Sequence, residues 1–188
     1  MSLTTLDAGV NSAQQRPPTA APVTKITYAM AQSALGRVLV AHSDAGVCAI
    51  SLGDNDDDLA DDLATQFPGS QLKVNGAALQ SEMGKVLQFI GSSDDVLDFA
   101  IDMHGTPFQC RVWEALRAIP MGTTITYTEL ARRVGAPKAV RAVASACASN
   151  AIALAIPCHR VVRCGGALAG YRWGIERKQA LLEMEARK

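Results

Sequence analysis

The sequence has no long apolar segment. None of its runs approaches the 18 or more consecutive apolar residues of a membrane-spanning helix, and its N-terminus lacks the basic and then apolar layout of a signal peptide. A hydrophobic content of 48% is nevertheless sufficient for a buried core. The 188 residues therefore predict a globular, cytoplasmic protein of one substantial domain or two small ones, with no part in a membrane.

Paired cysteines are also missing. The five cysteines are an odd number without Cys-x-x-Cys spacing, which argues against a disulfide framework and against a zinc knuckle. They are Cys48, Cys110, Cys147, Cys158 and Cys164. We expect reduced thiols, one of them reactive, and no metal site.

The chain has no net charge at pH 7, but this zero is the sum of two unlike halves. Residues 1–104 contain 5 Lys and Arg against 13 Asp and Glu, whereas residues 105–188 contain 13 against 5. A basic half next to an acidic half is expected when only one side of a protein meets a polyanion such as DNA. Uneven decoration of the surface is the alternative.

The acidic half begins with a biased segment and continues with regular patterns. Residues 1–23 are rich in Ala, Thr, Gln and Pro and predict a disordered tail. Residues 24–104 predict an α/β domain, in which the runs 26–30, 36–41 and 46–52, joined by turn residues, form an antiparallel meander. A helix is predicted over 81–91 and a last strand over 97–101.

Six aspartates lie close together within this half: Asp54, Asp56, Asp57, Asp58, Asp61 and Asp62. They open an apolar-spaced helix through Leu59, Leu63 and Phe67, where carboxylates interact favourably with the positive end of the helix dipole. A divalent-metal site is the alternative, although no Gly-centred ligand loop of the EF-hand kind follows.

Residues 105–188 predict a mainly helical domain. Thr106 is a good N-cap and Pro107 suits the first helical position. A short helix over 126–134, a Gly-Ala-Pro turn at 135–137 and a second helix over 138–149 form the pattern of a helix-turn-helix. An ordinary helical hairpin has the same pattern.

The second helix of this pair favours DNA as the partner. Lys138 and Arg141 lie near its start on one face, and mostly Ala and Ser follow. A helix that reads base sequence normally carries Asn, Gln or Arg side chains aimed at base edges. We therefore expect backbone and shape contacts with little sequence preference.

Cys158 is followed directly by His159 and preceded by Pro157. A thiol attacks as thiolate, and a free cysteine with a pKa of about 8.5 needs a basic neighbour to supply that form at neutral pH. Adjacent side chains on a strand face opposite sides, so the two residues cooperate only if Pro157 breaks the strand into a turn. The alternative is a buried structural cysteine beside an unrelated histidine.

Motifs spread over residues 106–185 resemble the O6-alkylguanine-DNA alkyltransferase family, in particular its Ada-like members. They are Thr106, Phe108-Gln109, Val112-Trp113, Ile119-Pro120, Tyr127, Pro137 to Val143, Asn150, Pro157 to Val162 and Gly170 to Trp173. The resemblance implies an α/β N-terminal domain that is ribonuclease-H-like and lacks catalysis. It also implies a mainly α C-terminal domain with a helix-turn-helix.

The resemblance further implies direct-reversal DNA repair without any cofactor. An alkyl group would pass once, irreversibly, from O6-alkylguanine or O4-alkylthymine in DNA to Cys158. His159 would take the thiol proton through a bound water and Glu185 would orient the imidazole, while Asn150 would brace the turn.

Because a thiolate cannot reach an alkylated base inside the stack, the nucleotide must be flipped out. The family pattern gives Arg141 the place of the intercalating residue and Tyr127 the support of the flipped base, with Lys138 and Ala139 also on DNA, and implies a monomer acting from the minor groove. The base pocket would be formed by Cys147, Val161, Tyr171, Arg172 and Trp173. Some relatives have smaller residues at the last two positions, so a narrower pocket is expected.

Two rival classes of protein share parts of this pattern. A damage sensor that only binds would keep the helix-turn-helix, Tyr127 and Arg141 but would not need a nucleophile, so Cys158 argues against it. A transcription regulator would use the same DNA-binding helix with the cysteine as a switch.

Overall fold

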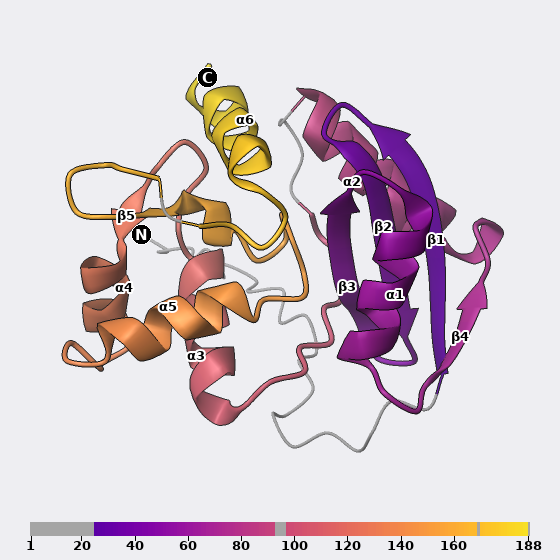
Figure 1. The fold of residues 1–188 in the computed structure, drawn as a ribbon, viewed down its shortest axis with the longest axis horizontal. Coiled ribbons are helices and arrows are strands. Elements are labelled where there is room, and N and C mark those ends of the chain that lie inside the picture. Colours follow the sequence, from indigo (N-terminus) through magenta and orange to yellow (C-terminus); the bar gives the residue numbers. More distant parts are fainter. Residues whose placement is uncertain (1–24, 93–96, 169, 188) are drawn as a thin grey trace, which may run out of the picture.

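The computed structural model describes residues 25–92, 97–168 and 170–187, so the predicted tail, residues 1–23, lies outside the described residues. Two parts lie side by side (Figure 1): a sheet with its helices, built from the first half of the chain, and a group of helices built from the second half. The mixed sheet and the helices are the α/β and mainly α parts that the sequence predicts.

The sheet has four strands in the order β3-β2-β1-β4. Their bounds are β1 Lys25–Ser33, β2 Gly36–Ser43, β3 Gly46–Gly53 and β4 Gln71–Val74. The first three form the predicted antiparallel meander, which is confirmed, and β4 pairs in parallel with the outer side of β1. The sequence did not predict β4, because four residues of which only Leu72 is partly buried give no clear alternation.

Both faces of the sheet are covered. Helix α1 (Asp56–Gln66) packs Leu59 and Leu63 against one face, and its N-terminus is capped by Asn55, whose side chain accepts a hydrogen bond from the Asp58 N–H. Helix α2 (Gln80–Ser92), after a short 3₁₀ turn, η1 (Ala77–Leu79), packs against the other face. Both helices confirm the predictions from apolar spacing, and the aspartates in the first turn of α1 lie where the helix dipole favours them.

The outer edge of β3 explains why the strand predicted over residues 97–101 is wrong. Only Ile101 pairs with the sheet, in a single bridge to Val47. A little further along the same edge, the Ile50 N–H donates to the Ala151 carbonyl oxygen (3.0 Å), and the Ile50 carbonyl oxygen accepts from the Ala153 N–H (2.9 Å). Because the bridge is parallel and joins Ile101 to the second residue of β3, residues 97–100 lie beyond the start of the strand with which they would pair. Two segments thus contact this edge of β3. The second of them leads directly to Cys158.

The C-terminal part consists of helices joined by one small parallel strand pair. Its elements are α3 Pro107–Arg117, β5 Ile125–Thr126, α4 Tyr127–Arg133, α5 Val140–Ala148, η2 Cys158–Arg160 (a 3₁₀ turn), β6 Val161–Val162 and α6 Ile175–Ala186. The predicted N-terminus of α3 is confirmed. The Thr106 side chain accepts from the Gln109 N–H, the Gln109 side chain accepts from the Thr106 N–H, and Pro107 occupies the first turn.

The turn between α4 and α5 differs in detail from the prediction. Thr126 caps α4, but α5 begins at Val140, so Lys138 and Ala139 lie in the turn before it and not in the helix. Pro137 disfavours a helical conformation in the residue before it and has no N–H to donate, and a separate turn closes from the Ala139 N–H to the Ala136 carbonyl oxygen (2.8 Å).

Within the ranges that the structure describes, no helix is long and apolar enough to span a membrane.

Candidate active site

Cys158 is the first residue of the 3₁₀ turn η2 and is only 5% exposed. The chain reaches it through a tight segment, in which Leu154 has a φ of 67°, the one positive φ of a non-glycine residue in the described ranges. Strained residues of this kind persist where the surrounding structure fixes them and cluster at functional sites. The turn after Pro157 is the break that the sequence argument required for Cys158 and His159 to act together.

Asn150 is fully buried and connects three parts of this segment. Its amide nitrogen donates to the Ile156 carbonyl oxygen (2.8 Å) and to the Cys158 Sγ (3.3 Å), while its carbonyl oxygen accepts from the Ile152 N–H (2.9 Å). One side chain therefore holds both the loop and the sulfur. A hydrogen bond donated to sulfur favours its anionic form.

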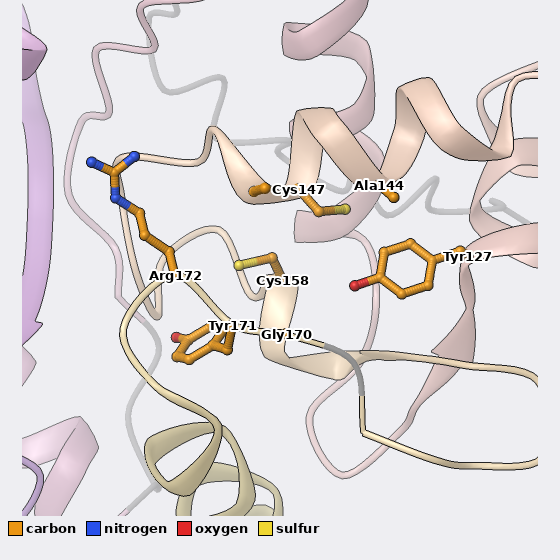
Figure 2. A pocket seen from close by; sticks show the side chains of 8 residues that line it. Tyr127, Ala144, Cys147, Cys158, Gly170, Tyr171 and Arg172 are labelled. Atoms are coloured by element: carbon orange, nitrogen blue, oxygen red, sulfur yellow. The ribbon is translucent and has the colours of Figure 1, made fainter.

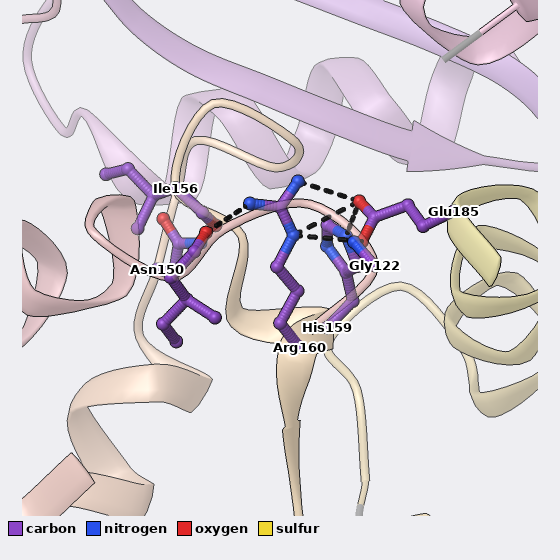
Figure 3. A network of polar contacts seen from close by, with 7 residues as sticks. Gly122, Asn150, Ile156, His159, Arg160 and Glu185 are labelled. Atoms are coloured by element: carbon purple, nitrogen blue, oxygen red, sulfur yellow. Dashed lines mark hydrogen bonds and ion pairs between the residues drawn. The ribbon is translucent and has the colours of Figure 1, made fainter. Parts of the chain in front are cut away.

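His159 and Arg160 meet Glu185 from the last helix (Figure 3). The His159 Nε2 lies 2.9 Å from the Glu185 Oε1, and the Arg160 guanidinium reaches both carboxylate oxygens at 2.8 to 3.1 Å. The Gly122 N–H also donates to Glu185 (3.1 Å), and a further Arg160 nitrogen donates to the Ile119 carbonyl oxygen (2.6 Å). All three charged or titratable side chains are buried.

The pKa values follow from this burial. Burial raises the pKa of Cys158, and the Asn150 hydrogen bond opposes that rise. Burial lowers the pKa of His159 in spite of Glu185, so the imidazole is neutral at pH 7. For Glu185, burial alone would raise the pKa, but the hydrogen bonds from His159 and Arg160 lower it to about 2. At rest the site therefore holds a neutral thiol, a neutral imidazole and a carboxylate.

The two imidazole nitrogens of His159 have different surroundings. A carboxylate only accepts hydrogen bonds, so Nε2 carries the proton that is donated to Glu185. Nδ1 is buried and has no hydrogen-bond partner among the described protein groups. The nitrogen that can accept a proton is therefore the one that Glu185 leaves unoccupied.

Sequence reasoning missed Lys178, which is fully buried on the first turns of α6. Its Nζ donates to the Val161 carbonyl oxygen (2.6 Å), burial lowers its pKa, and its charge favours the thiolate of Cys158. Nothing in the sequence marks a lysine in an amphipathic helix as buried, because such side chains are usually solvated.

A cavity of about 300 Å³ opens above the Cys158 sulfur (Figure 2). It is lined by Tyr127, Ala144, Cys147, Ala148, Cys158, Gly170, Tyr171 and Arg172. The predicted pocket residues Cys147, Tyr171 and Arg172 are among them. Val161 and Trp173 are not, because the Val161 side chain lies in the core and Trp173 is buried edge-on against Tyr171.

Helix α5 connects this cavity to an exposed basic surface. Ala144 and Ala148 line the cavity, and Arg141 lies three positions before Ala144 on the same side of the helix. Arg141 is exposed, as is Lys138 in the preceding turn, while Ala139 is partly exposed. The structure therefore places Lys138, Ala139 and Arg141 at the surface of the helix that lines the cavity and of the turn before it.

The site combines a buried thiol, the imidazole next to it in one turn, a carboxylate that accepts from the imidazole, and a cavity lined by the cysteine. This arrangement is typical of proteins that use cysteine as a nucleophile. Comparison with known proteins identifies the family. Residues 107–187 match the family model of the 6-O-methylguanine DNA methyltransferase DNA-binding domain.

Similar proteins extend the match beyond this region. The bifunctional transcriptional activator/DNA repair enzyme Ada of Escherichia coli is 49% identical over 161 residues, which cover 86% of this chain and 46% of Ada. The methylated-DNA--protein-cysteine methyltransferase of Mycobacterium leprae is 47% identical over 116 residues, which cover 61% of this chain and 68% of that protein. A crystal structure of Mycobacterium tuberculosis OGT in complex with DNA, 33% identical, superposes with a TM-score of 0.74 and covers 86% of this chain and 93% of that one.

The chain belongs to the O6-methylguanine-DNA methyltransferase family. It spans about half the length of the Ada protein that it matches.

Proposed function

We propose that this protein repairs DNA by moving the alkyl group of O6-alkylguanine, and of O4-alkylthymine, to its own Cys158. The observation that carries the proposal is the buried Glu185–His159 pair directly after Cys158, at the floor of a cavity. Family membership and the similarity to a structure that contains DNA support it.

The proposed reaction is a single displacement at the alkyl carbon, in which Cys158, His159 and Glu185 each have a defined role. The Cys158 sulfur forms a bond to the alkyl carbon while the bond from that carbon to O6 breaks, and the electron pair leaves with guanine. Guanine takes up a proton from water, and the imidazolium formed at His159 returns one to water. The thiol proton moves to His159 Nδ1, by way of a water. Glu185 stabilises the imidazolium that results, since the carboxylate already accepts from Nε2. The proposed reaction requires no metal or organic cofactor.

The thiolate is formed only when it is needed. Burial keeps the pKa of Cys158 raised at rest, so the proton leaves as the substrate fills the cavity and the displacement proceeds. Asn150 and Lys178 then stabilise the negative sulfur from two sides. Because a thioether has no easy route back to a thiolate, each molecule acts once.

The surface around the cavity suits a flipped nucleotide. We assign helix α5 the role of the second helix of a helix-turn-helix placed in the minor groove, with Lys138 and Ala139 on the phosphates and Arg141 in the gap that the flipped base leaves. Tyr127, half-buried at the cavity and with a pKa raised by burial to about 12, stays a neutral hydroxyl that meets the base.

The proposal also covers the rest of the chain. We assign residues 24–104 to a ribonuclease-H-like domain, which the meander with β4 parallel to β1 supports, and residues 105–188 to the alkyltransferase domain. The protein acts as a monomer in the cytoplasm, where a single-use thiol stays reduced.

Transfer of label from DNA separates this function from its rivals. The protein is incubated with duplex DNA that contains O6-methylguanine labelled in the methyl group. Repair predicts label on the protein up to one equivalent, with unmodified guanine left in the DNA. A binding-only sensor predicts a stable complex with label still in DNA, and a regulator predicts preference for one operator sequence.

Arg141→Ala should slow transfer from duplex DNA much more than transfer from the free base O6-benzylguanine. Extruding a stacked base costs a few kcal/mol, and losing a residue that fills the gap should slow the duplex reaction by about ten-fold or more. A free base has no stack to leave. Single-turnover rates on both substrates measure the difference, with Arg187→Ala, which removes an exposed cation at the end of α6, as the control. Equal losses on both substrates would remove the flipping role.

DNA affinity should fall steeply with salt. If Lys138 and its neighbours neutralise phosphates, the slope of log affinity against log salt is about −0.9 for each phosphate contacted on duplex DNA. Titrations of fluorescent duplexes of different flanking sequence should give one slope and nearly one affinity. Lys138→Ala should make the slope shallower by about one contact, and a flat salt dependence would contradict the assigned surface.

A further inference from the structure

Aspartates in and just before α1 form ion pairs with arginines of the C-terminal part of the chain. Asp54 is paired with Arg177, and Asp62 accepts from the Arg172 Nη2 at 2.7 Å, across 110 residues of sequence. Asp56 pairs with Arg37 within the same part of the chain. Two aspartates of the predicted cluster therefore hold the segment that precedes and opens α6.

Arg172 belongs to the catalytic cavity as well. It lines that cavity together with Cys158 and Tyr171, and its guanidinium is turned away from Cys158, toward the N-terminal part (Figure 2). On its other side lies a hollow of about 220 Å³ between α1, the end of β3 and Trp173. The same side chain thus lines both hollows.

Asp62 is held in place to receive this guanidinium. Its second carboxylate oxygen accepts from the Gln66 Nε2 (2.7 Å), one turn further along α1, which fixes the plane of the carboxylate. The backbone beyond Arg172 is anchored too, since the Arg177 guanidinium donates to the carbonyl oxygens of Trp173 (2.9 Å) and Leu35 (2.8 Å). The Arg172 side chain is then the adjustable part of an otherwise fixed wall.

We propose that Asp62 is a specificity-determining positioning residue, which holds Arg172 aside so that the cavity admits alkyl groups larger than methyl. This rests on the proposed alkyl transfer to Cys158. It gives the non-catalytic N-terminal part a direct effect on which lesions are accepted.

The Arg172–Asp62 ion pair is strong enough to favour one position of the Arg172 side chain but not to fix it there. The two side chains are 26% and 36% exposed, and exposed ion pairs contribute about 0.2–1 kcal/mol. An equilibrium shift of that size does not unfold the protein. It changes how often Arg172 swings into the space that a bulky alkyl group needs.

The test compares two lesions in one DNA sequence. Single-turnover rates are measured at saturating protein for duplexes with O6-methylguanine and O6-benzylguanine, so that binding to DNA cancels in the ratio. Asp62→Asn should lower the ratio of benzyl to methyl transfer by about 1.4- to five-fold, the range that such ion pairs allow. Asp61→Asn, which removes the same charge from the adjacent exposed position of α1, should leave the ratio unchanged.

Two further arms separate positioning from a general loss of structure. In an Arg172→Ala background, Asp62→Asn should have no effect on the ratio, because the side chain that it positions is gone. In the wild type, rising salt should lower the ratio toward that of Asp62→Asn. An unchanged or raised ratio in Asp62→Asn, or an equal effect in both backgrounds, overturns the inference. Absence of methyl transfer in the wild type would instead overturn the proposed function.

Discussion

Cys158→Ser should abolish alkyl transfer and leave damaged-DNA binding intact. A serine hydroxyl in this buried site is far less acidic than a thiol, so the rate should fall at least about a thousand-fold. The Cys158 side chain is buried and lies outside the proposed DNA-binding surface, which we assign to α5 and the turn before it. Rates of label transfer and titrations of a duplex containing O6-methylguanine measure the two properties separately.

The other cysteines serve as controls for this result. Cys147 lines the same cavity, but burial raises its pKa to about 12, and Cys110 lies on the buried side of α3 with its pKa also raised by burial. Cys164 is exposed on the loop after β6. Cys164→Ser should keep full transfer, and label that persists in Cys158→Ser would mean that another sulfur is the acceptor.

Glu185→Gln should be the second most damaging change, and it should act in two ways. Transfer should slow about a hundred-fold or more, on duplex DNA and on free O6-benzylguanine alike, because the imidazolium loses the carboxylate that stabilises it. The free energy of unfolding should also fall by about 3–5 kcal/mol, since the buried Arg160 guanidinium is left without a counter-charge.

A matched variant distinguishes these effects from a surface change. Glu183→Gln neutralises an exposed carboxylate two positions earlier on α6, which accepts a hydrogen bond from the Gln179 Nε2 (2.8 Å), one turn before it. We expect wild-type rates and stability from it. Urea denaturation gives the stability, and rates at a temperature where both variants are folded give the chemistry. A Glu185→Gln protein that is destabilised but reacts at the wild-type rate would leave the carboxylate a purely structural role.

The sequence was most informative where local chemistry determines structure. Turn residues between short apolar runs predict the meander of β1 to β3, and Thr106 with Pro107 predicts the start of α3. The adjacency of Cys158 and His159 required a turn after Pro157, and η2 provides it. In each case the deciding interactions lie within a few residues along the chain.

What the sequence did not reveal depends on contacts between distant segments. The strand expected over residues 97–101 is reduced to one bridge because Ile101 meets β3 at its second residue, so residues 97–100 have no strand beside them with which to pair. The buried Lys178 donates to the Val161 carbonyl oxygen, and Arg172 donates to Asp62. No local sequence pattern indicates such pairings. The sequence therefore identified the segment that forms the cavity wall, but not the contacts that its side chains make.

Intact-mass analysis of the protein after reaction with excess O6-methylguanine DNA tests the central claim most directly. Peptide mapping then locates the modification. We predict one added methyl group per molecule, carried by Cys158, and no further repair once every molecule is modified. Repair of more lesions than there are protein molecules, or a methyl group on any other residue, would contradict single-use transfer to Cys158.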